Sequence, residues 1–361
     1  MNYTSASQEN IISAMVVSLI AHAPTPLLRQ LAPGVGLSAA VAGSAMAIAF
    51  LFAPIASVPT MVIALVLGIV ANPLAQRAAF AQGITFCVRK LLRWAIALLG
   101  LRIALSDIAA LGVSTAVLVV FSMIVAILSG VMLARAFGKN SYYGVLAGVG
   151  TSVCGASATL ATATMLPHYE GKQADVAFVV VAVNAFSTAA MFLYVPLCIA
   201  LGFNSQDTGV MLGATIHDMA QVVGAGYAVS EPVGNTAVIV KLFRVSLLLP
   251  VVLGVGFYFS QPVTVSNAAR ISFPWFALGF VALCLINSSI PMMPSLAPIY
   301  APIKAGLLEL STWGLLIAIG ALGLSTSLSA VGMMGWRHLT IVIGTTFVIL
   351  FSVVAGLLFI G

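Results

Sequence analysis

Charged residues are scarce in this chain of 361 residues: they make up 6% of it, whereas hydrophobic residues make up 61%. A soluble domain is usually about 25% charged, and a mean hydropathy of +1.17 is far above that of a soluble protein. No polar stretch is long enough to form a separate soluble domain. The composition therefore excludes a soluble globular protein and indicates a polytopic membrane protein.

Several motifs that carry chemistry are missing as well. The four cysteines, Cys87, Cys154, Cys198 and Cys284, stand singly, which favours neither a disulfide framework nor a metal site. No GxxxxGK[ST], HExxH or GxSxG occurs, which argues against an ATP-driven pump and common hydrolases. Basic residues form no stripe interleaved with aromatic residues, so no nucleic-acid binding is expected. We therefore expect neither enzymatic activity nor a cofactor.

Apolar segments, most of them long enough for the roughly 20 residues of a spanning helix, recur along the chain. We expect about eleven, at residues 34–53, 58–75, 86–106, 109–134, 142–166, 174–201, 208–228, 235–259, 272–291, 303–328 and 338–360. Residues 1–32 are interpreted as an N-terminal lead-in and residues 33–361 as a single membrane domain. The expected fold class is an all-α polytopic membrane protein.

The basic residues are distributed unevenly when successive connections are assigned to alternate sides of the membrane. One side holds Arg29, Arg77, Arg89, Lys90, Arg93, Arg135, Lys139, Arg270 and Arg337, and the other holds Arg102, Lys172 and Lys304. The richer side is cytoplasmic by the positive-inside rule, which places the N-terminus inside and Gly361 outside. The glycine-rich fifth and seventh segments either span the membrane or form re-entrant hairpins, and the charges do not separate these alternatives.

A weak internal repeat relates the second and third segments to the ninth and tenth. Pro59 and Asn72 have the same spacing as Pro274 and Asn287, and the pattern LGL-x-x-x-LS follows at residues 99–106 and 322–329. The matched segments run in opposite directions, which is typical of the inverted-topology repeats of secondary transporters. The alternative is chance similarity between two helices rich in leucine and glycine.

The fifth segment contains GVGTSVCGASATLAT at residues 148–162, where glycine and hydroxyl residues interrupt an apolar run. Glycine lets the backbone leave helical geometry, and exposed N–H groups at the start of a half-helix attract anions. The motif is therefore a candidate anion cradle that includes Thr151, Ser152, Cys154 and Gly155. Close helix packing through small residues is the alternative.

The seventh segment carries His217, Asp218 and Gln221 within TIHDMAQVVGAG. Both His217 and Asp218 share a helical face with Gln221, and ionisable residues at membrane depth indicate function. They predict a proton relay, a cation ligand or a breakable charge partner, with Asn184 of the sixth segment as a further polar candidate. A simple interhelical hydrogen bond is the alternative for His217.

Lys241 and Arg244 follow in the next apolar run, three residues apart and hence on one helical face. Arginine matches anions with several oxygens through its planar set of donors. Arg244 is expected to contact an anion, to pair with Asp218 or to reach lipid headgroups. Snorkelling towards the headgroups is the more natural role for Lys241.

The motifs GTSVCGASA, TIHDMAQV and KLFR resemble those of the YeiH-like family of bacterial inner-membrane proteins, which is named for sulfate export. The resemblance extends from about Pro33 to the C-terminus, and Asp218 departs from it, because relatives often carry Glu there. It implies inverted repeats with discontinuous helices, as in cation/proton antiporters and bile-acid symporters. It also implies a multi-pass protein of the bacterial inner membrane, so the outer side, where the positive-inside rule places the C-terminus, is the periplasm.

We therefore expect a secondary transporter for a small anion, sulfate or an organosulfonate, coupled to Na+ or H+. Substrate binding is expected at Thr151, Ser152, Cys154, Gly155, Gln221, Lys241 and Arg244, and ion coupling at His217, Asp218 and Asn184. The expected partners are the anion and the lipid bilayer, and a homodimer stays open. The alternatives are a cation/proton exchanger using Asp218 and an intramembrane enzyme pairing Ser152 or Cys154 with His217.

Overall fold

A computed structural model describes residues 25–52, 60–259, 275–292, 297–325 and 336–360, and every regular element in them is helical. Six helices of this part are long and apolar enough to cross a membrane: Arg29–Phe52, Gly112–Ala136, Lys172–Ala200, Glu231–Tyr258, Pro298–Ser325 and Trp336–Phe359. Thr60–Val70, Met219–Val229 and Trp275–Ser289 are shorter apolar helices. The chain is therefore an all-α polytopic membrane protein, as its composition predicts.

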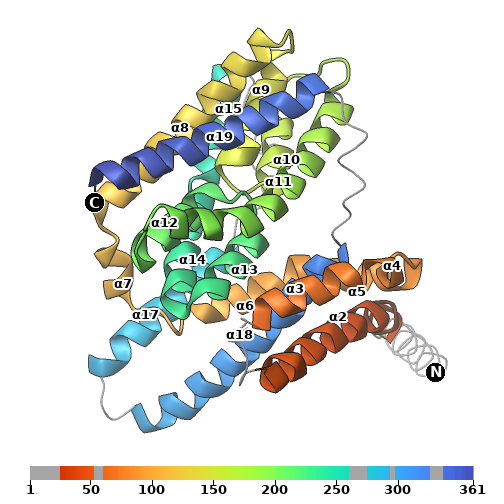
Figure 1. Cartoon of the computed structure of the whole chain (residues 1–361), viewed down its shortest axis with the longest axis vertical. Helices are drawn as coiled ribbons and strands as arrows, with labels where there is room; N and C mark the ends of the chain where they lie inside the picture. The colour runs from red at the N-terminus through yellow and green to blue at the C-terminus, as the bar shows by residue number, and fades with distance from the viewer. Residues whose placement is uncertain (1–24, 53–59, 260–274, 293–296, 326–335, 361) are drawn as a thin grey trace, which may run out of the picture.

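The helices form two bundles, which lie one above the other in Figure 1. The smaller bundle contains α2 (Thr25–Phe52), α3 (Thr60–Val70), α4 (Asn72–Ala75), α5 (Ala78–Phe86), the π-helical turn η1 (Cys87–Leu91), α6 (Leu92–Leu99), α17 (Trp275–Ser289) and α18 (Ala297–Ser325). The larger bundle contains α8 (Gly112–Ala136), α9 (Ser141–Ser152), α10 (Ala156–Met165), α11 (Lys172–Ala200), α12 (Ser205–Thr215), α13 (Met219–Val229), α14 (Glu231–Ser246), α15 (Leu248–Tyr258) and α19 (Trp336–Ile360). The short helix α7 (Leu105–Ala110) connects the bundles, and a single 3-10 turn (Ile290–Met292) follows α17.

Glycines allow the closest helix contacts within each bundle. A Cβ atom on Gly68 of α3 would lie 2.4 Å from the carbonyl oxygen of Gly320 in α18, and one on Gly144 of α9 would lie 2.4 Å from that of Gly130 in α8. Small residues drive helix association in a bilayer, where apolar burial between helices gains little over contact with lipid. These contacts fix α18 on α3 and the first half of the fifth segment on α8.

The fifth segment is a hairpin made of α9 and α10. Tyr142, at the start of α9, stacks on Tyr169, just beyond α10, with ring centroids 5.1 Å apart. Midway along the pair, a Cβ atom on Gly150 would lie 2.5 Å from Thr159 Oγ1. The segment therefore turns back at its centre and ends beside its own start.

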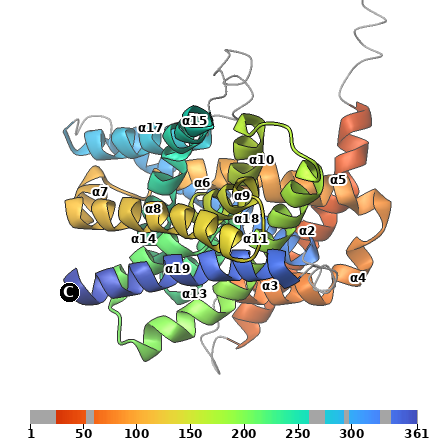
Figure 2. The same cartoon turned by 90° about the horizontal axis from the view of Figure 1, so that it is seen from above.

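The seventh segment folds back in the same way, through α12 and α13. Gly209 in α12 and Gly226 in α13 both lie against the first turns of α14, next to Thr236 and Gly234 respectively. This hairpin starts at the N-terminal end of α14, whereas Tyr142 packs against Phe259 at the far end of α15. The two hairpins therefore enter the larger bundle from opposite ends, as Figure 1 also shows. Helices α8 and α19 run alongside each other in this bundle (Figure 2).

The hairpins decide between the alternatives left open by the charge pattern and correct one residue. Alternate assignment placed Lys172 on the side opposite Arg135 and Arg337. Because the fifth segment turns back, Lys172 lies on the same side as they do. Asp175, in the first turn of α11, is 3.3 Å from His338 at the start of α19. The prediction for Lys172 was wrong, and its correction adds a positive charge to the richer side.

The third segment also differs from its predicted bounds of 86–106. It is one continuous helix from Ala78 to Leu99, with the π-helical turn in its middle. Ser311, at the centre of α18, donates a 2.7 Å hydrogen bond to the carbonyl of Ala95. Arg93 therefore lies half-way along the bundle. The sequence prediction, which placed it at the cytoplasmic end, was wrong. The basic turn 89–93 had been interpreted as a boundary because charge usually marks one.

Asn72 and Asn287, which the predicted internal repeat matches to each other, make reciprocal hydrogen bonds. Asn72 Nδ2 donates to the carbonyl of Leu324 at 2.7 Å, and Asn287 Nδ2 donates to that of Ile103 at 3.3 Å. Each amide thus bonds near the LGL motif of the other half. Residues 328 and 329, at the end of the second motif, lie outside the described residues.

Candidate functional site

The first hairpin breaks at residues 153–155, immediately after the motif GVGTS. Gly155 has φ +67° and ψ −127°, a backbone conformation that L-residues with a side chain rarely adopt. It is the N-cap of α10, and a Cβ atom there would lie 3.7 Å from that of Asp218. The tip of the first hairpin therefore touches the break of the second.

The second hairpin breaks at residues 216–218, where the only adjacent histidine and aspartate of the chain stand. Asp218 is the N-cap of α13, and its carboxylate accepts a 2.5 Å hydrogen bond from the N–H of Met219. The N–H of Asp218 donates to Ser187 Oγ in α11 at 2.9 Å. A short acid at this position caps the helix, because the backbone N–H groups of Met219 and Ala220 both interact with its carboxylate.

Lys241 joins the two breaks from α14. Its ammonium group donates to the carbonyls of Val153 (2.9 Å), Ile216 (2.8 Å) and His217 (2.6 Å). The side chain is completely buried, and a lysine ammonium has three N–H donors in total. All three therefore serve hairpin carbonyls.

Arg244, one turn further along α14, does the same for the ends of the preceding half-helices. Its Nε donates to Ser152 O at 2.8 Å and its Nη2 to Thr151 O at 2.9 Å, both in α9. Its Nη1 donates to Gly213 O at 2.9 Å and Ile216 O at 3.1 Å in the second hairpin. The guanidinium is completely buried, and four of its five N–H donors are engaged.

The chemistry of this arrangement follows from how helices end. The last four carbonyls of a helix lack a partner within it, and the C-terminus carries a partial negative charge of roughly half a unit. Here α9 and α12 both end inside apolar protein. Two buried cations supply the missing donors and neutralise the two negative helix ends. We call Lys241, Arg244 and these carbonyls the α14 clamp.

His217 links the first hairpin to α19. Its Nδ1 is 3.1 Å from the carbonyl oxygen of Thr151, and its Nε2 is 3.0 Å from Thr346 Oγ1. The ring is completely buried. Because a carbonyl only accepts, Nδ1 carries a proton in this geometry. His217 therefore holds the hairpin break in place and does not hydrogen-bond to Asp218.

Polar groups gather where α13 meets α11. Gln221 Nε2 is 3.4 Å from Thr188 Oγ1, whose hydroxyl also bonds to the carbonyl of Asn184. Gln221 is 1% exposed, and its Oε1 has no partner among the described residues. Asn184 is exposed on the same helical face as Thr188. A buried amide oxygen without a donor indicates that something else approaches it.

The expected anion cradle is built differently from the sequence prediction. The hydroxyls of Thr151 and Ser152 bond to carbonyls of their own helix, and both side chains are fully buried. Their carbonyls, not their hydroxyls, take part in the clamp. Cys154 Sγ lies 3.0 Å from Ser157 Oγ, and Ser157 is exposed at the start of α10. The first exposed polar residue of the motif is therefore Ser157.

Thr346 and Arg93 were not predicted from the sequence, and Ser187 was a polar candidate beside Asn184 for which packing was the favoured role. Ser187 and Thr346 were indistinguishable from packing hydroxyls, although Ser187 lies on the same face as Asn184. Arg93, from the smaller bundle, was interpreted as a topology marker. The structure places it close enough for its charge to act on Asp218, together with that of Lys241. A basic residue seven positions into an apolar run was the available signal.

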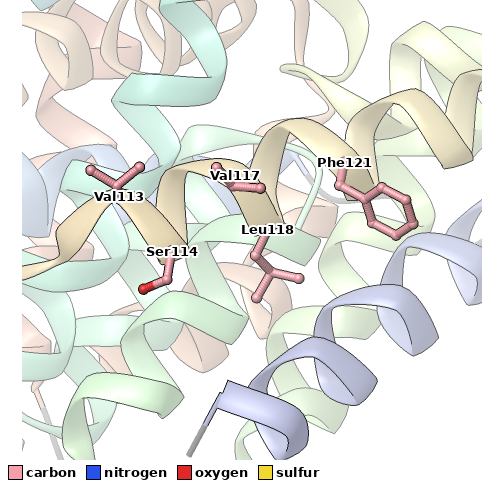
Figure 3. Close-up of a pocket in the computed structure, with 5 residues that line it drawn as sticks. All are labelled: Val113, Ser114, Val117, Leu118 and Phe121. Atoms are coloured by element: carbon pink, nitrogen blue, oxygen red, sulfur yellow. The ribbon is translucent and has the colours of Figure 1, made fainter.

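A pocket of about 380 Å³ lies elsewhere, along the outer face of α8 (Figure 3). Its lining residues are Val113, Ser114, Val117, Leu118 and Phe121. Val113, Val117 and Phe121 are more than half exposed, as lipid-facing side chains are. With a single hydroxyl and no charge, this pocket is separate from the chemistry of the hairpins.

Fold and site together define a polytopic membrane protein whose two broken helices meet at buried cationic side chains. The chain matches the family described as conserved hypothetical protein 698 over residues 33–342, and it belongs to that family. It is 38% identical to the UPF0324 membrane protein TauZ of Paracoccus pantotrophus over 93% of this chain and 97% of the relative. It is 33% identical to the UPF0324 inner membrane protein YeiH of Salmonella typhi over 85% and 88%, respectively. No solved structure matches the chain.

These relatives confirm the resemblance to the YeiH-like family. They also support an inner-membrane, multi-pass protein.

Proposed function

We propose that this protein is a secondary transporter for a small anion of the sulfate or organosulfonate class, coupled to an ion. The observation that carries the proposal is the meeting of two hairpins, entered from opposite ends, at their non-helical breaks. Irregular backbone at membrane depth is tolerated only inside protein or along a cavity. In secondary transporters such broken helices form the substrate and ion sites near the bilayer midplane.

The reciprocal hydrogen bonds of Asn72 and Asn287 support an inverted-topology repeat. If a two-fold axis relates the two halves of the chain, two matched residues should each form a hydrogen bond with the opposite half. Chance sequence similarity would not produce this pair of hydrogen bonds. The repeat lets two similar conformations open to opposite sides. We place the N-terminus in the cytoplasm and the C-terminus in the periplasm by the positive-inside rule.

The anion is assigned to the break of the first hairpin, at Cys154, Gly155 and the first turn of α10. The first N–H groups of a helix are unpaired within it and carry partial positive charge, and such ends bind anions. Ser157 is exposed there. Lys241 and Arg244 act on the anion through their charge, since their N–H donors bind the carbonyls of the clamp. Gln221 contributes from the neighbouring polar group that it forms with Thr188 and Asn184.

Coupling is assigned to Asp218, with His217 and Asn184 as its polar neighbours. A carboxylate at the tip of a hairpin, next to the proposed anion, changes the local charge by one unit when it gains a proton. Because both hairpins are held by α14, we propose that the larger bundle moves as one body past the smaller one. No enzymatic step is needed, and the partners are the anion and the bilayer, with a homodimer left open.

A binding screen of the purified protein tests the proposal. Sulfate, sulfite, thiosulfate and methanesulfonate are added separately, with chloride at equal ionic strength as the control. At least one should raise the melting temperature in a saturable way, because a ligand that binds only the folded state stabilises it. Uptake into proteoliposomes of the anion so identified should follow. If none stabilises the protein more than chloride does, the proposal fails.

A cation/proton exchanger is the second candidate, favoured by the unpartnered Gln221 Oε1 one turn from Asp218. That oxygen and the carboxylate are acceptors, which suit a positively charged partner. Proteoliposomes with only a non-transported organic anion separate the two functions. Proton flux driven by a sodium gradient under these conditions, and lost in Asp218→Asn, favours the exchanger.

A further inference from the structure

We propose that Arg93 of the smaller bundle binds the transported anion, and that ionised Asp218 competes with the anion for it. The inference rests on the proposed function and adds two things to it. It names the residue that contacts the substrate from the opposite bundle. It also fixes the sign of coupling, because the anion and a proton then bind in the same state.

Arg93 has the position that such a residue needs. The hydrogen bond between Ser311 and Ala95 places it half-way along α18 and therefore near the middle of the membrane. The buried face of α6, including Ala95, belongs to the same apolar cluster as the hairpins. An arginine at this depth is costly, even on lenient insertion scales by roughly 2.5–3.5 kcal/mol. It therefore calls for a compensating partner.

No strong partner compensates Arg93 in the described residues. Its guanidinium carbon lies 5.9 Å from the ring centroid of Phe276, and its side chain is exposed. It makes no hydrogen bond or ion pair with the described part of the chain. In contrast, Lys241 uses all three of its N–H donors on carbonyls, and Arg244 uses four of its five. Arg93 is thus the cation near the hairpin tips whose donors are available for an anion.

Asp218 is an acid whose charge interacts with that of Arg93. The positive charges that act on this carboxylate are those of Lys241 and Arg93. Asp218 also lies beside Gly155, the N-cap of α10, where the anion is proposed to bind. A dianion such as sulfate, placed between Arg93 and α10, would stand next to a second negative charge. Protonation of Asp218 removes that repulsion and frees Arg93.

Other titratable groups around Asp218 leave this competition intact. Lys241 faces it from α14 and Cys154 from the first hairpin, and His217 is its neighbour in the chain; Arg244 acts on Cys154. Helix α3 has no titratable residue, and neither does α11 for four residues on either side of Ser187. Two further helices contact α13, namely α12 and α18, and their acids are distant from Asp218. Asp207 lies at the outer end of α12. Glu309 of α18 is ten residues before Ile319, the residue that lies near Gly224 of α13.

The consequence is co-transport: an anion and a proton cross together. In the empty carrier, the positive charge of Arg93 balances the negative charge of ionised Asp218. In the loaded carrier, Arg93 holds the anion and Asp218 is protonated. Either form is closer to neutral than a carrier with the anion alone. The coupling direction therefore follows from a single carboxylate and a single guanidinium.

The test measures sulfate and methanesulfonate binding at pH 6 and pH 8 to wild type, Arg93→Gln, Arg93→Lys, Asp218→Asn and Arg89→Gln. Arg89 is the matched control, an exposed arginine one turn away on the same helix. Wild type and Arg89→Gln should bind more tightly at pH 6. Asp218→Asn should bind equally at both pH values, and Arg93→Gln should lose at least tenfold in affinity at both. Arg93→Lys should recover part of the loss and keep the pH profile.

The outcomes separate the inference from the proposed function. If wild type binds neither anion, the proposed function falls, and the inference falls with it. If wild type binds but Arg93→Gln binds equally well, only the role of Arg93 is refuted. If Asp218→Asn weakens binding at both pH values and stays pH-dependent, the competition is refuted. Monodisperse elution of each variant shows that it is folded.

Discussion

Replacing Arg244 by alanine distinguishes a clamp from a substrate ligand. The guanidinium serves four carbonyls, those of Thr151, Ser152, Gly213 and Ile216. After Arg244→Ala, two of them keep a bond from the neighbouring imidazole and ammonium groups. Ser152 and Gly213 lose their side-chain donor inside dry protein.

Leaving a buried polar group unpaired costs about 1–3 kcal/mol, so the two carbonyls together cost about 2–6 kcal/mol. Total stabilities are only about 5–15 kcal/mol. With roughly 2 °C lost per kcal/mol in a large domain, the melting temperature should fall by at least about 4 °C. The loss of a fully buried side chain adds to this.

The assay is thermal unfolding of the purified protein in detergent without any anion. Arg135→Ala is the matched control, because that arginine is exposed and makes one hydrogen bond, to Ser141. Its melting temperature should change by less than about 2 °C, as for most surface substitutions. If Arg244→Ala melts like Arg135→Ala and loses only anion binding, then Arg244 is a ligand contact and the clamp is wrong.

Two substitutions test the backbone geometry. Gly155→Ala should destabilise the protein by about 1–3 kcal/mol, because its φ of +67° strains a residue with a Cβ atom. An unchanged melting temperature would show that the backbone at residue 155 does not have this conformation. Gly68→Ala should cost a similar amount, since its Cβ atom would lie 2.4 Å from Gly320 O. The control for both is Gly254→Ala, with no atom within 4 Å of the added Cβ, and unfolding of all three by heat decides the matter.

The two breaks could be predicted from the sequence because they carry side-chain signals. Glycine and hydroxyl residues at 148–162 and the pair His217–Asp218 stand out in an apolar chain, and both lie at or beside the observed breaks. The segment bounds are also close for α8, α11 and α19. The long apolar runs of α8 and α11 give way to polar residues at Arg135 and Asn204, as those of spanning helices do.

The partners of Lys241 and Arg244 could not be predicted in this way. Both cations bind backbone carbonyls, which every residue possesses and which leave no mark in the sequence. Side-chain reasoning therefore sought an acid or a substrate for them. Arg93 was missed for a related reason: a basic residue near the start of an apolar run looks like a boundary. A continuous helix from Ala78 to Leu99 places it in the interior.

The order of the chain gives the α14 clamp a consequence for biogenesis. Both hairpins emerge from the ribosome before Lys241 and Arg244 do. Until α14 enters the membrane, the carbonyls of Ser152, Gly213 and Ile216 lack the side-chain donors of the clamp, and lipid offers none. We therefore expect the nascent hairpins to stay at the water-filled translocon or at the membrane surface. Insertion of α14 then becomes the step that commits the larger bundle to its final topology.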